Sequence, residues 1–237
     1  MMLVILIALL AVIAFGAYAL LSRRKSAADA QRAAFLAQGF APCPERHAEI
    51  ERRHNELSTT TGQGGFTIRD PFWVDVVGHS VFSFLSVPPA TMASGVAGPR
   101  QAFMLPFSGA TGRAQVWLTN SAIEANPMLS QKFKLVMSVL DREVPTSTLA
   151  RLEVPESWAA HRVIGAIGER GGTLDGLLGP RVGEALADAA EHGFFQALFG
   201  DGWLVLERSP FAGAISAPRD SLGARIAFVK KLATRAG

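Results

Sequence analysis

The sequence is short of the residues that many small functional sites require. Cys43 is the single cysteine among 237 residues, which excludes an intramolecular disulfide and any cysteine-rich metal site. Charged residues make up 18%, and the formal net charge of +3 is small and dispersed. Lys and Arg form no stripe interleaved with aromatic residues, so we expect no nucleic-acid partner. The 49% of hydrophobic residues are ample for a packed core.

Apolar residues dominate the beginning of the chain. The run from Met1 to Leu21 contains no charged side chain, and its length matches the roughly 20 residues that a membrane-spanning helix needs. Arg23, Arg24 and Lys25 follow directly, and they are the expected contacts with anionic lipid. Because Lys and Arg stay on the cytoplasmic side, this pattern predicts a single-pass protein of the bacterial inner membrane with a cytoplasmic C-terminal domain.

A cleaved signal peptide is the alternative interpretation of this run. Ala17-Tyr18-Ala19 fits the pattern of small residues at a cleavage site. Against it, the run lacks a basic segment before it and is long for a signal peptide. We therefore predict a transmembrane anchor over residues 1–22.

The next segment, residues 23–65, is predicted to be a helical linker next to the membrane. An Ala-rich helix is expected to end at Gly39, because glycine tolerates the left-handed conformation after a helix. A second, charged helix is expected from Glu45 to Leu57. Ser58 to Gly65 has the composition of a linker and marks the expected domain boundary.

Two structured parts are predicted after this boundary, and together they give an α+β fold class. Residues 66–155 are expected to form a small antiparallel sheet, with a helix after Asn126-Pro127 and a strand over 135–140 as the alternative. Residues 156–237 are expected to form a strand-helix-hairpin-helix unit. Its predicted elements are the strand from His161 to Ile167, the helix from Pro180 to Glu191, the hairpin from Phe194 to Glu207 and a helix from Pro218 onward.

The last quarter of the chain resembles some membrane-tethered bacterial proteins of unknown function. The residues that carry the resemblance are Leu177 to Leu186, which begin a helix, and Gly202 to Leu206, which lie in the predicted hairpin. These motifs are structural. The resemblance implies an architecture and no activity.

Three sequence patterns resemble catalytic or ligand-binding motifs only in part. Gly78-His79-Ser80-Val81-Phe82 lacks the second glycine of a nucleophile elbow, and a strand pattern follows it. The glycines from Gly165 to Gly172 match neither G-x-G-x-x-G nor G-x-x-x-x-G-K-[ST], the two spacings typical of nucleotide-binding loops. His47 and His54, with Glu51 between them, lack the H-E-x-x-H spacing of a zinc site. We therefore predict no catalytic residue, no metal and no cofactor.

Four tryptophans are each explained by core packing. Trp203 is expected in the core of the hairpin unit, together with Leu206. Trp73, with Phe72 before it, has a second interpretation as a contact for a partner protein, because tryptophan is favoured at interface hot spots.

Two functional hypotheses from different classes follow. The first is a non-enzymatic accessory or scaffolding subunit whose domain docks on a larger bacterial membrane protein complex of respiratory, photosynthetic, transport or envelope type. The second is a membrane-tethered enzyme or small-ligand-binding domain with a site near His79 and Gly168 to Gly172. A polar pocket joining these two segments would favour the second hypothesis.

Overall fold

The computed structural model describes residues 26, 28–58, 65–89, 99–128, 130–131, 149–208 and 219–235. It divides the chain into two compact units, Met1–Phe40 and Ala41–Gly237. In the first unit, residues 28–37 are helical. Gly39 has a φ of 82°, the left-handed conformation expected where this helix ends.

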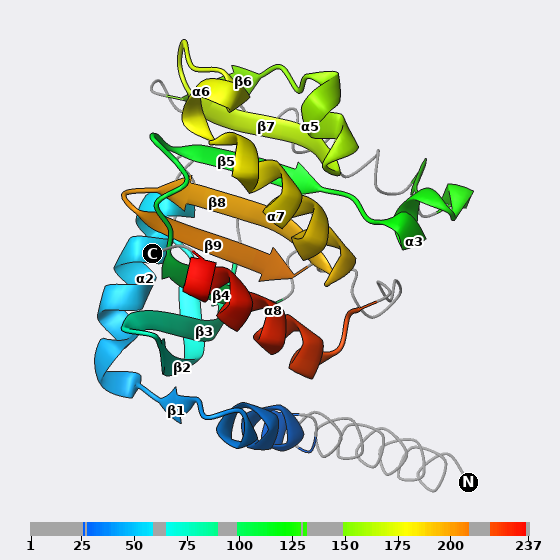
Figure 1. The fold of residues 1–237 in the computed structure, drawn as a ribbon. Coiled ribbons are helices and arrows are strands. Elements are labelled where there is room, and N and C mark those ends of the chain that lie inside the picture. The colour runs from blue at the N-terminus through cyan, green and yellow to red at the C-terminus, as the bar shows by residue number, and fades with distance from the viewer. Residues whose placement is uncertain are drawn as a thin grey trace, which may run out of the picture. The chain divides into compact units, whose positions relative to one another are not determined.

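The second unit is built on one antiparallel sheet, which has nine strands within the described residues (Figure 1). The strands are β1 (Ala41–Pro42), β2 (Thr67–Val76), β3 (His79–Val87), β4 (Arg100–Pro106), β5 (Ala114–Leu118), β6 (Leu149–Leu152), β7 (Val163–Glu169), β8 (Phe194–Gly200) and β9 (Trp203–Arg208). Their order across the sheet is β1-β2-β3-β4-β9-β8-β5-β7-β6.

This topology corrects the predicted fold class. The prediction separated a sheet-rich section, residues 66–155, from a strand-helix-hairpin-helix unit, residues 156–237. Instead, the β8–β9 hairpin lies in the middle of a single sheet, because β9 pairs with β4 and β8 pairs with β5. Every residue of β8 is buried, and its place inside the sheet gives this strand a neighbour on both sides.

The membrane-spanning helix in the predicted fold class is also corrected. The longest helix among the described residues, α8 (Leu222–Arg235), has 14 residues and carries several charges, whereas a span needs about 20 apolar residues. No helix in this part of the chain is long and apolar enough to cross a membrane. The predicted span over 1–22 and the basic residues Arg23, Arg24 and Lys25 lie outside the described residues. The single-pass description is therefore not carried forward.

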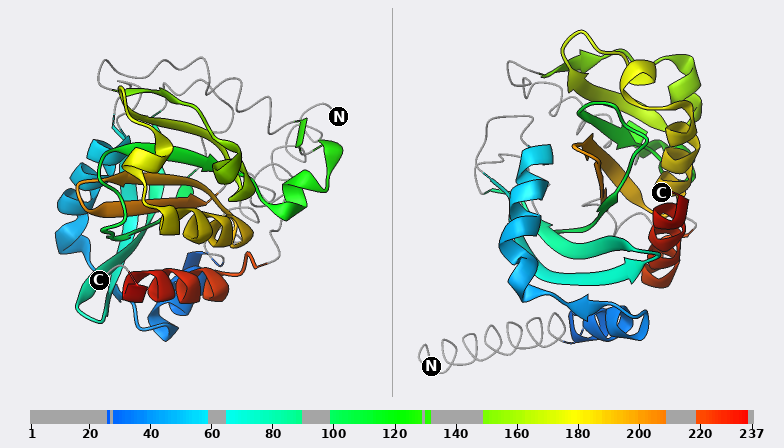
Figure 2. Two further views of the ribbon diagram at one scale, coloured as in Figure 1. Left: turned by 45° about the horizontal axis from the view of Figure 1, so that its top comes forward. Right: turned by 60° about the vertical axis from the view of Figure 1, so that its left-hand side comes forward.

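Helices cover both faces of the sheet, as the right-hand view of Figure 2 shows. One face carries α2 (His47–Ser58), and the other carries α7 (Pro180–Glu191) together with α8. Shorter helical segments connect the strands. They are η1 (Pro44–Arg46), α3 (Ser121–Glu124), α5 (Glu156–Ala160) and α6 (Leu174–Leu177). Most of the predicted helix after Asn126-Pro127, including the alternative strand over 135–140, lies outside the described residues.

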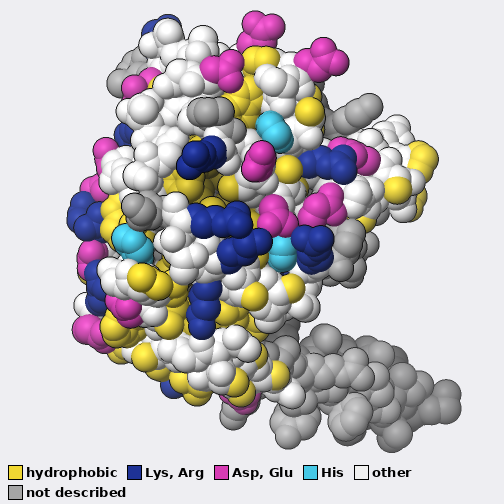
Figure 3. Space-filling model, viewed as in Figure 1, with side chains coloured by type: hydrophobic (Ala, Val, Ile, Leu, Met, Phe, Trp, Pro, Cys, Tyr) yellow, Lys and Arg dark blue, Asp and Glu magenta, His cyan; other side chains and the backbone are white. Residues whose placement is uncertain are grey.

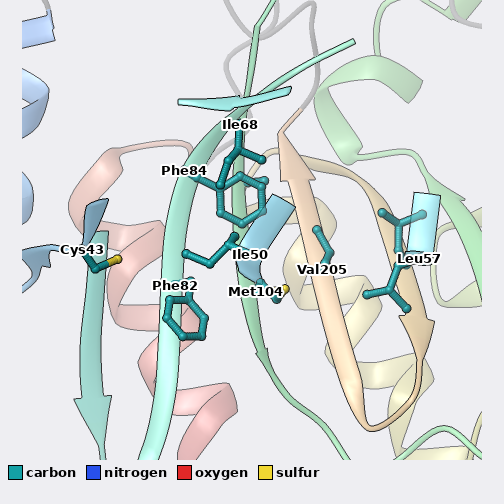
Figure 4. Close-up of a cluster of buried hydrophobic side chains, with 10 residues drawn as sticks. Cys43, Ile50, Leu57, Ile68, Phe82, Phe84, Met104 and Val205 are labelled. Atoms are coloured by element: carbon teal, nitrogen blue, oxygen red, sulfur yellow. The ribbon is translucent and has the colours of Figure 1, made fainter. Parts of the chain in front are cut away.

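The core beneath α2 is a cluster of apolar side chains that point from alternate strand positions toward the helix (Figure 4). Ile50 and Leu57 are seven residues apart in α2. This spacing places both side chains on the same face of the helix, toward the sheet. The cluster consists of Cys43, Ile50, Leu57, Ile68, Phe82, Phe84, Ala102, Met104, Leu198 and Val205.

The opposite face of the sheet is held by aromatic contacts. Phe103 of β4 and Phe194 of β8 pack edge to face with ring centroids 5.9 Å apart. Phe194 in turn lies 6.0 Å from Phe228 of α8. These rings anchor α8 against the centre of the sheet, and they fix the helix layer that forms the surface described below.

Candidate functional site

The two segments of the predicted ligand site do not come together. His79 and Ser80 begin β3, whereas Gly168 lies at the end of β7. Five strand spacings separate β3 from β7 in the sheet, which corresponds to about 24 Å. A pocket joining them is therefore not part of the described structure.

The glycines near the end of β7 are explained by packing. A Cβ at Gly168 would lie 2.6 Å from side-chain atoms of both Leu152 and Leu177. A Cβ at Gly172 would lie 3.0 Å from Leu177 as well. Between them, Gly171 has a φ of 85° and makes the turn. These glycines thus allow the leucine of α6 to pack closely against the sheet.

Ser80 has none of the geometry of a nucleophile elbow. It pairs with Asp75 across the β2–β3 hairpin, and β3 continues as a strand to Val87. An elbow instead places its serine on a sharp turn from a strand into a helix. The turn before Ser80 is a hairpin turn at Val77 and Gly78, which both have positive φ.

The histidines of α2 bind different partners. The Nε2 atom of His47 lies 2.9 Å from the carbonyl oxygen of Ile68. The backbone N–H of Ile68 donates a hydrogen bond to Glu51. The Nε2 atom of His54 lies 2.8 Å from Oε1 of Glu207. The two imidazoles therefore do not face a common ligand.

The predicted partner contacts at the start of the sheet are largely covered by this chain. Phe72 is buried, and Trp73 is half-buried against the cluster beneath α2. The short strand β1 pairs with both residues through Pro42 and Ala41. The other predicted contact residues, Arg23 to Lys25, lie outside the described residues.

A buried polar network under α2 was missed by the sequence analysis. His54 and Glu207 are almost fully buried and make the 2.8 Å contact described above. Arg100 donates a hydrogen bond to the other carboxylate oxygen of Glu207 at 3.3 Å. Ser58 Oγ lies 3.4 Å from His54 Nδ1. Burial alone would raise the pKa of Glu207, but the hydrogen bond from His54 and the charges of His54 and Arg100 lower it to about 2.

This network is arranged like a Ser-His-Glu triad, but its surroundings give it a structural role. A catalytic base must reach the substrate within hydrogen-bonding distance. The His54 ring is 0% exposed and packs edge to face against Phe66 and Phe84, at 5.1 Å and 5.4 Å. We interpret the network as the link that holds α2 to β4 and β9. Arg100 and Glu207 are distant in sequence from His54 and Ser58, so no local motif could have indicated the network.

A groove between α7 and α8 has a volume of about 980 Å³. Its floor is apolar and includes Val182 and Ala185 of α7 with Phe228 and Leu232 of α8. The loop after β4 closes one end with Phe107, Ser108 and Gly109. Both helices pack on the sheet, α7 against β8 and α8 against β3.

Charged side chains surround this floor. Arg181, Lys231 and Arg235 are exposed, and they make no ion pair within the described residues. Of the two acidic lining residues, Asp188 lies 3.2 Å from Arg219, which compensates its charge, and Glu184 is exposed on α7. Figure 3 shows Lys and Arg side chains gathered near the middle of this face with hydrophobic side chains between them. The groove thus combines an apolar floor with an excess of positive charge.

Comparisons with known proteins give little further information. No protein-family model matches the chain, and no curated protein matches it. Among solved structures, it is similar to the crystal structure of the mycobacterial trehalose monomycolate transport factor A, TtfA, with a TM-score of 0.36 and 9% sequence identity. The similarity covers 73% of this chain and 74% of that chain. A TM-score this low carries no argument about fold or function. The resemblance to membrane-tethered bacterial proteins stays a prediction.

Proposed function

We propose that the second unit is a non-enzymatic docking domain of an accessory subunit, and that it binds a larger bacterial membrane protein complex through the groove between α7 and α8. The observation that carries this proposal is a set of three cations, Arg181, Lys231 and Arg235, that have no ion-pair partner among the described residues and lie beside an apolar floor. An apolar centre with a polar rim is the usual anatomy of a protein interface.

The rigid backing of the groove supports the same function. Phe228 of α8 is buried against Phe194 of the sheet, and Val182 of α7 is 2% exposed. Binding to a preformed surface loses little conformational entropy, which favours affinity. Docking is therefore the function that this surface serves best.

The competing hypothesis of an enzyme or ligand-binding domain relied on a site near His79 and Gly168 to Gly172. Those segments are five strand spacings apart, and the glycines have a packing explanation. No observation therefore favours that site. The absence of enzymatic activity and the cytoplasmic location both stay predictions.

Filling the groove tests the proposal. Ala185→Phe adds a ring to the floor of the groove, and Ala227→Phe adds the same ring to an exposed position of α8 that does not line it. We expect the tagged full-length chain and the Ala227→Phe control to elute in gel filtration at the mass of a large complex. Ala185→Phe should elute at the mass of the free chain, because steric overlap weakens the association by at least about tenfold.

Thermal unfolding followed by circular dichroism verifies that both variants fold. The proposal is wrong if the wild-type chain elutes alone from gently solubilised cells. It is also wrong if folded Ala185→Phe remains in the complex as well as the control does.

A further inference from the structure

We infer that the groove between α7 and α8 holds an acidic amphipathic helix of the partner protein, with its carboxylates beside Arg181, Lys231 and Arg235. This inference rests on the proposed docking function and adds the chemistry of the segment that docks. It depends on where the charges lie along the groove, and on the shape of its apolar floor.

The three cations gather at one end of the groove. Figures 1 and 2 show α7 and α8 side by side and antiparallel, so the start of α7 lies beside the end of α8. Arg181 is in the first turn of α7, and Lys231 and Arg235 are one turn apart in the last part of α8. The loop that closes this end is held in place by a 2.9 Å hydrogen bond from Gly179 N–H to the carbonyl of Gly109.

Among the described residues that line it, the other end of the groove carries no comparable excess of positive charge. Asp188 lies there in the third turn of α7, where Arg219 and His192 contact it. A ligand with negative charge at one end would therefore gain favourable interactions in one orientation only. Complementary charge of this kind sets the orientation and increases the rate of association.

The apolar floor suits single side chains better than a lipid chain. Val182, Phe228 and Leu232 are only 2%, 6% and 8% exposed, so each presents only a small part of its apolar surface to the groove. A fatty acyl chain needs most of its methylene groups buried to bind stably. An amphipathic helix needs only a few anchor residues at helical spacing along the groove.

The dimensions agree with a short helix. The 12 residues of α7 extend over about 18 Å, which corresponds to slightly more than three turns of a helix lying alongside it. The partner segment we infer therefore presents apolar residues at positions i, i+4 and i+7 toward the floor, with Glu or Asp in the turn nearest Arg181.

Synthetic peptides test this inference on the full-length protein. The probe is a fluorescein-labelled 18-residue helical peptide with Leu on one face and three Glu residues at one end, and its control has Gln in place of each Glu. In fluorescence anisotropy at low salt, the Glu peptide should bind at least about tenfold more tightly than the Gln peptide, and the difference should shrink as salt is added.

Charge reversal in the groove provides the matched comparison. Lys231→Glu should weaken binding of the Glu peptide by at least about fivefold. Arg69→Glu changes an exposed arginine of β2 outside the groove, and it should leave the affinity within about twofold. Vesicles of anionic phospholipid should not displace the peptide.

Three outcomes would overturn the inference. The Glu peptide does not bind, or both peptides bind equally well. In the third outcome, the anionic vesicles displace the peptide from the wild-type protein, and Lys231→Glu abolishes this displacement. Each leaves the docking function standing if Ala185→Phe still dissociates the native complex. Conversely, a wild-type chain that forms no complex contradicts the docking function, whichever peptide binds.

Discussion

At the scale of single residues, the buried hydrogen bond between His54 and Glu207 is the most consequential feature. Both side chains lie between α2 and the sheet, and Arg100 completes the charge balance. Removing one partner from a buried pair leaves the remaining charge without compensation in a low-dielectric environment, which costs more than the pair contributes.

We therefore expect Glu207→Gln to lower the free energy of unfolding by about 3–5 kcal/mol. Urea unfolding at pH 7 measures this change. Glu56→Gln is the control, because Glu56 pairs with Arg52 on the exposed side of α2 and surface pairs contribute about 0–1 kcal/mol. A loss below about 1 kcal/mol for Glu207→Gln would contradict the structural role of the network.

The lowered pKa of Glu207 also predicts how stability depends on pH. A carboxyl group with a pKa of about 2 in the folded chain and 4.5 in the unfolded chain stabilises the fold above pH 4.5. This contribution is lost as the pH falls from about 4.5 to about 2, and it amounts to about 3 kcal/mol.

Urea unfolding at a series of pH values between 7 and 3 should therefore show a decrease that is shallower in Glu207→Gln than in the wild type. The difference between the two proteins should be largest at neutral pH. Parallel pH profiles would mean that Glu207 keeps an ordinary pKa in the folded chain.

At the scale of elements, the sequence analysis identified local structure better than pairing. The helix from Pro180 to Glu191 was predicted with the bounds that the structure has, because Pro180 marks its first turn and the glycine at 193 follows its end. The β8–β9 hairpin was likewise predicted from its Gly200-Asp201-Gly202 turn. Asp201 and Gly202 both have the positive φ values that such a turn requires.

The pairing of distant strands was not predictable from local patterns. Nothing in β4 indicates that its neighbour is β9, about 100 residues further along the chain, rather than β5. The same applies to the candidate site. Arg181 and Lys231 lie on separate helices, and only the antiparallel packing of those helices gives them a common groove. His54 and Glu207 were each visible in the sequence, but their contact was not.

Trp203 of β9 lies in a different environment from the one that was predicted for it. The sequence analysis expected Trp203 and Leu206 in one core, but they occupy alternate faces of β9. Leu206 is buried, whereas Trp203 is half-buried, with its ring 6.2 Å from Phe82 and beneath the guanidinium of Arg53 at 4.8 Å.

Trp203→Ala should therefore cost about 2–3 kcal/mol, less than the 3–5 kcal/mol of a fully buried tryptophan. Chemical denaturation measures it, with Leu206→Ala as the buried comparison at about 2–5 kcal/mol. A cost for Trp203→Ala below about 1 kcal/mol would indicate that the ring contributes little to the core.

At the scale of the whole molecule, the described domain is distinct from the predicted anchor. Apolar residues 1–22 lie outside the described residues, and no described helix is long and apolar enough to span a membrane. What the domain offers is a rigid sheet with a helix layer whose groove has an apolar floor and unpaired cations. The central claim is that a partner protein binds in this groove.

Hydrogen–deuterium exchange on the purified complex, compared with the isolated full-length chain, tests that claim most directly. Amide exchange reports where a partner slows local opening of the backbone. We predict slower exchange in α7, in α8 and in the loop at residues 107–109, with no change in α2 on the opposite face. Unchanged exchange in α7 and α8, with protection appearing in α2 instead, would contradict docking through the groove.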